Sequence, residues 1–369
     1  MPLPERSSVY VAGKRTTRDV ALTAMARGLP LGLSARPPSQ LTEVTASPAP
    51  ATDLARAKDS ATDASAPKTP VIAYSTVAGS MLQGVAEDVL DSRFMRKYEG
   101  KVQLIFTSPP FPLNRKKKYG NKKGQDYVEW LADLAPVFTR FLAPKGSIVL
   151  ELGNAWVEGE PVMSVLALEA MLGFLRKGNL NLCQQFICDN PARLPGPIQW
   201  VNIERVRVKD SFTHVWWMAP DPRPHADNRQ VLKAYSKSMK GLLKRQKYNP
   251  GKRPSEHHIG ETSFLQNNEG AIPSNVLSYA NTNANDDYRK YCLANGIKRH
   301  PARMPAGLAE FFIKFLTREG DLVLDPFGGS NTTGSVAEKL KRRWLSIEPL
   351  TDYIEGSKGR FTTIRSEAK

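Results

Sequence analysis

The chain has 369 residues, and its 52 Lys and Arg residues outnumber its 36 Asp and Glu residues by sixteen. This length predicts one large domain or two lobes, and 41% apolar residues are enough for a hydrophobic core. Three cysteines without a CxxC pair exclude a disulfide framework and a zinc site, and no apolar run is long enough to span a membrane. The excess of positive charge favours a polyanionic partner, and a basic enzyme without such a partner is the alternative.

The first 70 residues differ in composition from the rest of the chain. Between Arg36 and Pro70, 23 of 35 residues are Ala, Pro, Ser or Thr, and none is aromatic. Such a segment buries too little apolar surface to offset its chain entropy. We therefore expect residues 1–70 to be a disordered extension and linker, with one short amphipathic helix at 17–28.

From Val71 onward, short apolar runs alternate with segments of helical spacing. Strands are expected at 102–106, 147–150, 322–324 and 344–347. Helices are expected at 127–142, 311–316 and 332–341, and Pro144-Lys145-Gly146 is expected to end the first of these helices. Strands that alternate with helices predict an α/β fold with a mostly parallel sheet covered on both faces.

The middle of the chain, at about 193–292, interrupts this alternation. It is rich in Pro, Asn and Gly and contains an aromatic cluster formed by Trp200, Trp216 and Trp217. We expect an inserted region with its own task, in which Trp216 and Trp217 belong to the core.

A glycine-containing segment, Asp325–Thr332 (DPFGGSNT), lies directly after a predicted strand and before a predicted helix. Ligands of open parallel sheets bind at such strand ends, and glycines let the backbone approach a cofactor. Ser335 stands where a phosphate-binding loop requires Lys, whereas Glu348, 23 residues after Asp325, is placed to bind ribose hydroxyls. The segment therefore favours a nucleoside cofactor over an ordinary strand-to-helix turn.

A second segment, Thr107–Phe111 (TSPPF), follows the strand predicted at 102–106. Its two prolines stiffen the backbone, which on its own indicates only a rigid turn. Its position favours a functional site, because both segments end strands of the same predicted sheet.

TSPPF followed later by DPFGGSNTTG resembles the S-adenosylmethionine-dependent amino-methyltransferases of DNA. The order of the two motifs is that of the beta class, and the chain is most similar to cytosine-N4 modification methylases of the PvuII type. Further matching blocks are LPxPIxWVN (Leu194–Asn202), RVKD (Arg207–Asp210), VWW (Val215–Trp217) and HPARxPA (His300–Ala306). The resemblance covers about residues 72–360.

The resemblance implies a mostly parallel seven-stranded sheet with helices on both faces and an inserted target-recognition region. It divides the chain into a catalytic half (71–192), a target-recognition region (193–292) and a cofactor-binding half (293–369). The residues implied to bind S-adenosylmethionine are Asp325, Phe327, Gly328, Gly329, Ser330, Glu348, His300 and Pro305. The chain departs from the family at Val85, where relatives usually have Asp, and at Glu151, where relatives tend to have Asp.

The catalytic residues implied by the resemblance are Ser108, Pro109, Pro110, Phe111 and Glu151. The Ser108 hydroxyl and the Pro109 carbonyl would accept hydrogen bonds from an exocyclic amine, Glu151 would orient Ser108, and Phe111 would stack on a flipped base. Methylation at carbon 5 is excluded, because it needs a cysteine that in that family follows a proline, and no cysteine here does.

The family acts on double-stranded DNA, which gives the basic stretches a role. Six basic residues are expected to contact phosphates: Arg115, Lys116, Lys117, Lys118, Lys122 and Lys123. The resemblance also implies the modification arm of a restriction-modification system, a monomer that acts on the same site as a cognate endonuclease, and a cytoplasmic, nucleoid-associated bacterial protein.

Two alternatives stay open. The first is an adenine-N6 methyltransferase, although such relatives more often have Asp or Asn at the position of Ser108. The second is a non-catalytic DNA-binding protein with a methylase fold, which Val85 favours slightly and an intact Ser108 and Asp325 oppose.

Overall fold

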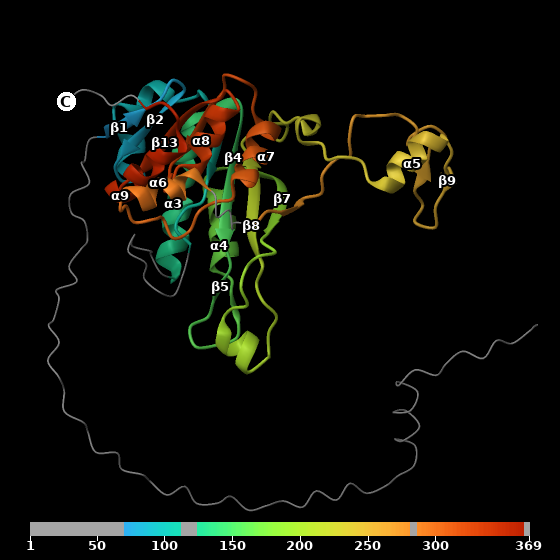
Figure 1. The fold of residues 1–369 in the computed structure, drawn as a ribbon, viewed down its shortest axis with the longest axis horizontal. Coiled ribbons are helices and arrows are strands. Elements are labelled where there is room, and N and C mark those ends of the chain that lie inside the picture. Colours follow the sequence, from blue (N-terminus) through green and yellow to red (C-terminus); the bar gives the residue numbers. More distant parts are fainter. Residues whose placement is uncertain (1–69, 112–123, 281–285, 365–369) are drawn as a thin grey trace, which may run out of the picture. The chain divides into compact units, whose positions relative to one another are not determined.

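The computed structural model describes residues 70–111, 124–280 and 286–364. A nine-stranded sheet forms its centre (Figure 1). In sheet order the strands are β1 (Val71–Ser75), β2 (Gly79–Gln83), β13 (Arg343–Glu348), β12 (Leu322–Asp325), β3 (Val102–Thr107), β4 (Leu142–Gly153), β8 (Phe212–Ala219), β7 (Asn181–Asp189) and β11 (Val276–Ser278). Five neighbouring pairs are parallel, and β1–β2, β4–β8 and β8–β7 are antiparallel. The mostly parallel sheet is confirmed, with nine strands instead of seven.

Helices cover both faces of the sheet. The helices of the described ranges are α2 (Ala86–Asp91), α3 (Gly124–Phe141), α4 (Leu166–Lys177), α5 (Lys237–Arg245), α6 (Asp287–Ala294), α7 (Ala306–Leu316), α8 (Thr332–Lys339) and α9 (Thr351–Ser357), and α5 is not among those that cover the sheet. One buried cluster joins α2, α3 and α4 to one face, and a second joins α7, α8 and α9 to the other. The central strands are therefore buried on both sides, which explains their nearly continuous apolar sequences.

The expected elements recur with shifted ends. The helix α3 ends at Phe141, before Pro144-Lys145-Gly146, but β4 begins at Leu142 and not at Ser147, so these three residues lie within the strand. The pairing of β3 with β4 jumps from Val102–Leu142 to Leu104–Ser147, so the extra residues form an irregularity in a continuous strand. A Cβ on Gly146 would lie 2.8 Å from the Val102 carbonyl oxygen, which explains a glycine at this position.

The expected insertion at 193–292 contributes three elements to the body around the sheet. β8 pairs with β4 and β7, β11 pairs with β7, and α6 packs near α9. The expectation that Trp216 and Trp217 belong to the core is confirmed, since both are buried, one in the cluster on each face of the sheet, so they form no cluster with Trp200. Trp200 instead contacts Trp156, with ring centroids 6.0 Å apart.

The rest of 193–292 is built from short elements. A turn of π-helix, Gln199–Ile203, lies in the loop between β7 and β8. A small unit contains α5 and the paired strands β9 (Gly251–Lys252) and β10 (His258–Ile259), and Tyr248 packs on Phe264 within it. Two further short strands, β5 (Ala155–Trp156) and β6 (Met163–Ser164), pair after β4. No helix in the described part of the chain is long and apolar enough to cross a membrane.

Candidate active site

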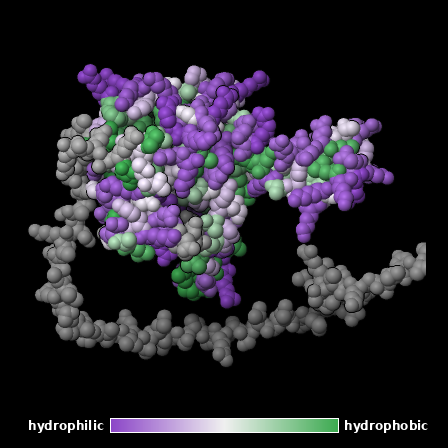
Figure 2. Space-filling model, turned by 45° about the horizontal axis from the view of Figure 1, so that its top comes forward, coloured by the Kyte–Doolittle hydropathy of each residue, from purple (hydrophilic) through white to green (hydrophobic). Residues whose placement is uncertain are grey.

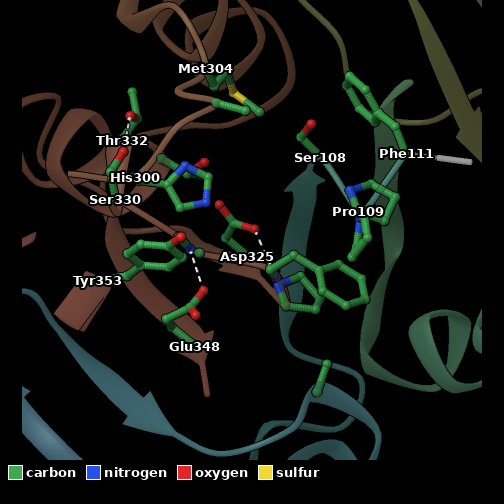
Figure 3. A pocket seen from close by; sticks show the side chains of 18 of the residues that line it. Ser108, Pro109, Phe111, His300, Met304, Asp325, Ser330, Thr332, Glu348 and Tyr353 are labelled. Atoms are coloured by element: carbon green, nitrogen blue, oxygen red, sulfur yellow. Dashed lines mark hydrogen bonds between the residues drawn. The ribbon is translucent and has the colours of Figure 1, made fainter. Parts of the chain in front are cut away.

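A cavity of about 500 Å³ lies at the carboxyl ends of β3, β4, β12 and β13 (Figure 3). The residues expected to act in catalysis or cofactor binding that line it are Ser108, Pro109, Pro110, Phe111, His300, Asp325, Phe327, Gly328, Gly329, Ser330 and Glu348. The catalytic segment forms one side and the glycine segment the other, which places both at one edge of the sheet, as the sequence predicted.

Asp325 joins the two segments. Its Oδ1 accepts hydrogen bonds from Thr107 Oγ1 at 2.6 Å and from the Phe327 backbone N–H at 3.1 Å. Burial raises the pKa of this carboxyl, although its hydrogen bonds oppose that shift. Asp325 thus fixes the end of β12 against β3 and sets the spacing between the catalytic and glycine segments.

Gly328 and Gly329 provide a surface without side chains. A Cβ on Gly328 would lie 3.0 Å from Ser346 Cβ, and one on Gly329 would lie 3.1 Å from His300 Nε2. Gly329 also has a φ of 51°, in the left-handed region that glycine adopts readily. The pair keeps the backbone accessible from the cavity, as close approach of a cofactor requires.

Glu348 ends β13 and faces the same cavity. Its Oε2 accepts the Gly329 N–H at 2.9 Å, and its Oε1 accepts the Leu350 N–H at 3.0 Å. Burial raises the pKa of Glu348 to about 7 against the opposing effect of these two bonds. Each oxygen keeps acceptor capacity, so the carboxylate is suited to bind ribose hydroxyls.

Asn331 was not singled out from the sequence, and it organises the start of α8. It has a left-handed backbone (φ 52°), and its Oδ1 accepts from the Gly334 N–H at 3.1 Å and from Ser346 Oγ at 2.7 Å. Its Nδ2 donates to the Tyr74 hydroxyl at 2.9 Å. The available signal was local, because Asn is favoured both at helix N-caps and in the left-handed region.

Arg360 is a second residue that the sequence did not indicate. Its Nε donates to the Ser330 carbonyl at 2.6 Å, and its Nη2 donates to Ser330 Oγ at 3.1 Å. Its Nη1 lies 3.4 Å from Asp286 Oδ1, and Asp286 also pairs with Arg303. The guanidinium lies 4.8 Å from the centroid of the Tyr288 ring, whose hydroxyl accepts the His300 N–H at 2.7 Å. Arg360 thus connects the glycine segment, through Ser330, with the segment around His300, through Tyr288.

The catalytic segment is held from β4 and β8. Burial raises the pKa of the Glu151 carboxyl, which hydrogen-bonds the Ser108 hydroxyl and accepts from Thr213 Oγ1 at 2.9 Å. Glu151 does not line the cavity itself but contacts Ser108, which does. Phe111 lies against Gly153, where an added Cβ would be 2.5 Å from the ring. The geometry of the catalytic segment therefore depends on Gly153 as well as on Glu151.

The departure at Val85 has a partial counterpart in the structure. Val85 and Glu87 both line the cavity, and Glu87 Oε1 accepts a hydrogen bond from Trp130 Nε1 at 2.5 Å. Trp130 packs edge-on against Phe327, with centroids 5.8 Å apart. An acidic group is thus present on this side of the cavity, two residues after the position where relatives carry it.

Not every expected site residue lines the cavity. Pro305 precedes α7 as its N-cap residue and does not line it. The six basic residues from Arg115 to Lys123 lie outside the described residues, as do residues 1–69, so the expectations for those segments stay predictions. Within the described ranges, no three His, Cys, Asp or Glu side chains are grouped to hold a metal ion.

Comparisons with known proteins agree with this geometry. A family model for DNA methylases (N6_N4_Mtase) matches residues 102–359. The chain is 42% identical over 291 residues to the type II methyltransferase M.PvuII of Proteus hauseri, covering 78% of this chain and 85% of the relative. It is 38% identical over 267 residues to M.HpaI of Haemophilus parainfluenzae, covering 71% and 69% of the two chains.

The fold has a counterpart among solved structures. The PvuII DNA methyltransferase, described as cytosine-N4-specific, superposes with a TM-score of 0.63 at 37% identity, over 79% of this chain and 89% of that one. Methylases of this family take their methyl group from S-adenosylmethionine. Gly328 and Gly329 leave the protein backbone open to contact this cofactor, and the Glu348 carboxylate is suited to bind its ribose. The chain belongs to the DNA methylase family and is an S-adenosylmethionine-dependent methyltransferase.

Proposed function

We propose that this enzyme methylates N4 of a cytosine that is flipped out of duplex DNA at a specific site. The observation that carries the proposal is the position of Ser108, which lines the same cavity as the glycine segment. Its hydroxyl is hydrogen-bonded to Glu151, which does not line the cavity. The relatives M.PvuII and M.HpaI are type II methyltransferases, which supports a role in restriction-modification.

The chemistry follows from the amine. The lone pair of an exocyclic amino group is delocalised into the ring, so the nitrogen attacks poorly unless its N–H bonds are held out of the ring plane. When Ser108 donates its hydrogen to Glu151, its oxygen lone pairs are free to accept from the amine. The Pro109 carbonyl provides a second acceptor, and the adjacent proline Pro110 restricts its direction.

S-adenosylmethionine, when bound, supplies a methyl group on a positively charged sulfur. Asp325, Gly328, Gly329, Ser330 and Glu348 would hold it, with His300 on the same side of the cavity. Phe111 lies at the opposite side, and in this proposal it would stack on the flipped base. The contribution of these side chains is proximity and orientation, because the methylated amine loses its proton without a strong base.

We assign target recognition to the parts of 193–292 that lie outside the central sheet. The catalytic half (71–192) and the cofactor half (293–369) frame this region, and residues 1–70 precede them as an extension. The basic residues from Arg115 to Lys123 follow the catalytic segment directly and would contact phosphates. A monomer in the bacterial cytoplasm, associated with the nucleoid and sharing its site with a cognate endonuclease, completes the proposal.

Digestion of methylated DNA followed by mass spectrometry of the nucleosides tests the proposal. We expect N4-methylcytosine after incubation of purified enzyme with unmodified DNA and S-adenosylmethionine. N6-methyladenine instead would show an adenine enzyme. Cofactor binding without any methylated nucleoside, or no cofactor binding at all, would support a non-catalytic DNA-binding protein. Sequencing at single-base resolution would then give the target site.

A further inference from the structure

The loop between β7 and β8 exposes apolar side chains to an unusual degree. Val208 is 86% exposed and Leu194 is 83% exposed, which makes them the most exposed large hydrophobic residues in the described part of the chain. Ile198, Ile203 and Val206 of the same loop are 66%, 65% and 59% exposed. Figure 2 shows an apolar area at the lower end of the body, toward which β5 and this loop extend in Figure 1. Clusters of exposed apolar residues commonly mark contact sites.

Contacts within the loop join the segment that contains Leu194 to the segment that contains Val208. Lys209 Nζ donates to the Arg193 carbonyl at 3.2 Å, which joins the two sides of the loop next to both residues. The Asn190 N–H donates to the Ser211 carbonyl at 2.7 Å and closes the base of the loop. The two apolar side chains are therefore displayed by an internally bonded loop.

The far end of the loop is also fixed. The Arg207 guanidinium lies 3.7 Å from the centroid of the Trp156 ring, and its Nη1 donates to the Pro161 carbonyl at 3.0 Å. Trp156 in turn contacts Trp200. These contacts connect the loop to the short strands β5 and β6 and oppose a collapse that would cover Leu194 and Val208.

The loop reaches the active-site cavity at the residue next to Leu194. Arg193, the residue before Leu194, lines that cavity together with Ser108 and Phe111. The loop also carries Arg193, Arg205, Arg207 and Lys209 against Glu204 and Asp210, so it offers positive charge to a phosphate backbone. A duplex that delivers a base to this cavity would meet the loop.

We infer that Leu194 and Val208 insert into the DNA beside the flipped base and stabilise the opened site. This inference rests on the proposed function. Extruding a base leaves an unstacked gap, and apolar side chains are used by DNA-bending proteins to fill such gaps between base steps. Burying two exposed aliphatic side chains there would offset part of the cost of unstacking.

Single-turnover methyl transfer with the double variant Leu194→Ala/Val208→Ala tests this role on two duplexes. One has a normal target cytosine, and the other has an abasic site in place of the guanine opposite, which makes extrusion easier. We expect a loss of about ten- to hundredfold on the paired duplex, which is what burial of one or two aliphatic side chains contributes to an equilibrium. On the abasic duplex we expect the variant to match the unmodified enzyme.

The matched control is Val77→Ala/Leu293→Ala, which removes exposed apolar side chains, 76% and 64% exposed, that do not line the active-site cavity. It should behave like the unmodified enzyme on both duplexes. An unchanged rate for the test variant, or an equal loss on both duplexes, overturns the insertion. A shift from dimer to monomer in sedimentation, with unchanged transfer, would assign the pair to contact between copies instead. If the unmodified enzyme methylates neither duplex, the proposed function fails and not only this inference.

Discussion

The glycine segment and the loop between β7 and β8 both face the same cavity, but they are built in opposite ways. Asp325, Asn331 and Glu348 are buried and hydrogen-bonded to neighbouring backbone or side chains. Leu194 and Val208 are almost fully exposed. The cofactor side is held by hydrogen bonds within the protein, whereas the loop leaves apolar surface that a partner would cover.

This difference predicts different effects of mutation. Breaking a buried polar network leaves other polar groups unsatisfied and costs stability or cofactor affinity. Exposed loop substitutions usually change the free energy of unfolding little, so their effects should appear only with DNA. The predictions below test whether each side of the cavity behaves as its construction implies.

The largest effect is expected at the reacting amine. Ser108→Ala should reduce single-turnover methyl transfer by about 10²- to 10³-fold, the range measured when one hydrogen-bonding group that acts in the transition state is removed. The dissociation constants for S-adenosylmethionine and DNA should remain close to those of the unmodified enzyme. A variant with nearly normal transfer would refute the role of the hydroxyl.

On the cofactor side, pH should affect stability through Glu348. Its pKa is raised to about 7, so its contribution to folding is complete below the ordinary value near 4.5 and is lost as pH rises through 7. The free energy of unfolding, measured with denaturant and without cofactor, should therefore fall between pH 5 and pH 8. The fall should be about 2–3 kcal/mol larger in the unmodified enzyme than in Glu348→Gln.

Burial shifts the pKa values of Asp325 and Glu151 in the same direction, so the unmodified enzyme alone cannot isolate Glu348. The difference between the two proteins removes those shared contributions. Parallel pH curves for the two proteins would contradict the raised pKa of Glu348.

Arg360 tests whether the cofactor side depends on a residue outside any motif. Arg360→Met removes both bonds to Ser330 and should weaken S-adenosylmethionine binding about tenfold, while the KM for DNA stays unchanged. Arg360→Lys, which keeps the charge, should be intermediate. The control Arg343→Met removes an exposed arginine that binds the Gly320 carbonyl and should change neither constant. Equal weakening of cofactor and DNA binding would indicate a general structural role for Arg360.

The smallest effect is expected from one charge in the basic stretch that follows the catalytic segment. Lys117→Gln should lower DNA affinity severalfold and reduce the slope of log affinity against log salt by about 0.9, the value for one phosphate contact. The loss should be the same on target and non-target DNA, because phosphate contacts carry no sequence information. A loss confined to the target would make Lys117 a reader of bases.

The sequence alone determined the fold class, the two motif segments and eleven of the 25 residues that line the cavity. Buried strands and helices have characteristic apolar patterns, and the chemistry of a strand-to-helix turn is contained in a few adjacent residues. The same local information placed Ser108 and Gly329 at strand ends and therefore at one edge of the sheet.

Only the tertiary structure decided which distant residues support that site. Arg360 reaches Ser330 across 30 residues, Thr213 reaches Glu151 across 62, and β8 enters the central sheet from a region that reads as an insertion. The segments that contain Leu194 and Val208 are joined only when Lys209 bonds the Arg193 carbonyl. Such contacts depend on how strands and helices pack together, and no short sequence pattern records them, because each partner alone resembles an ordinary polar or surface residue.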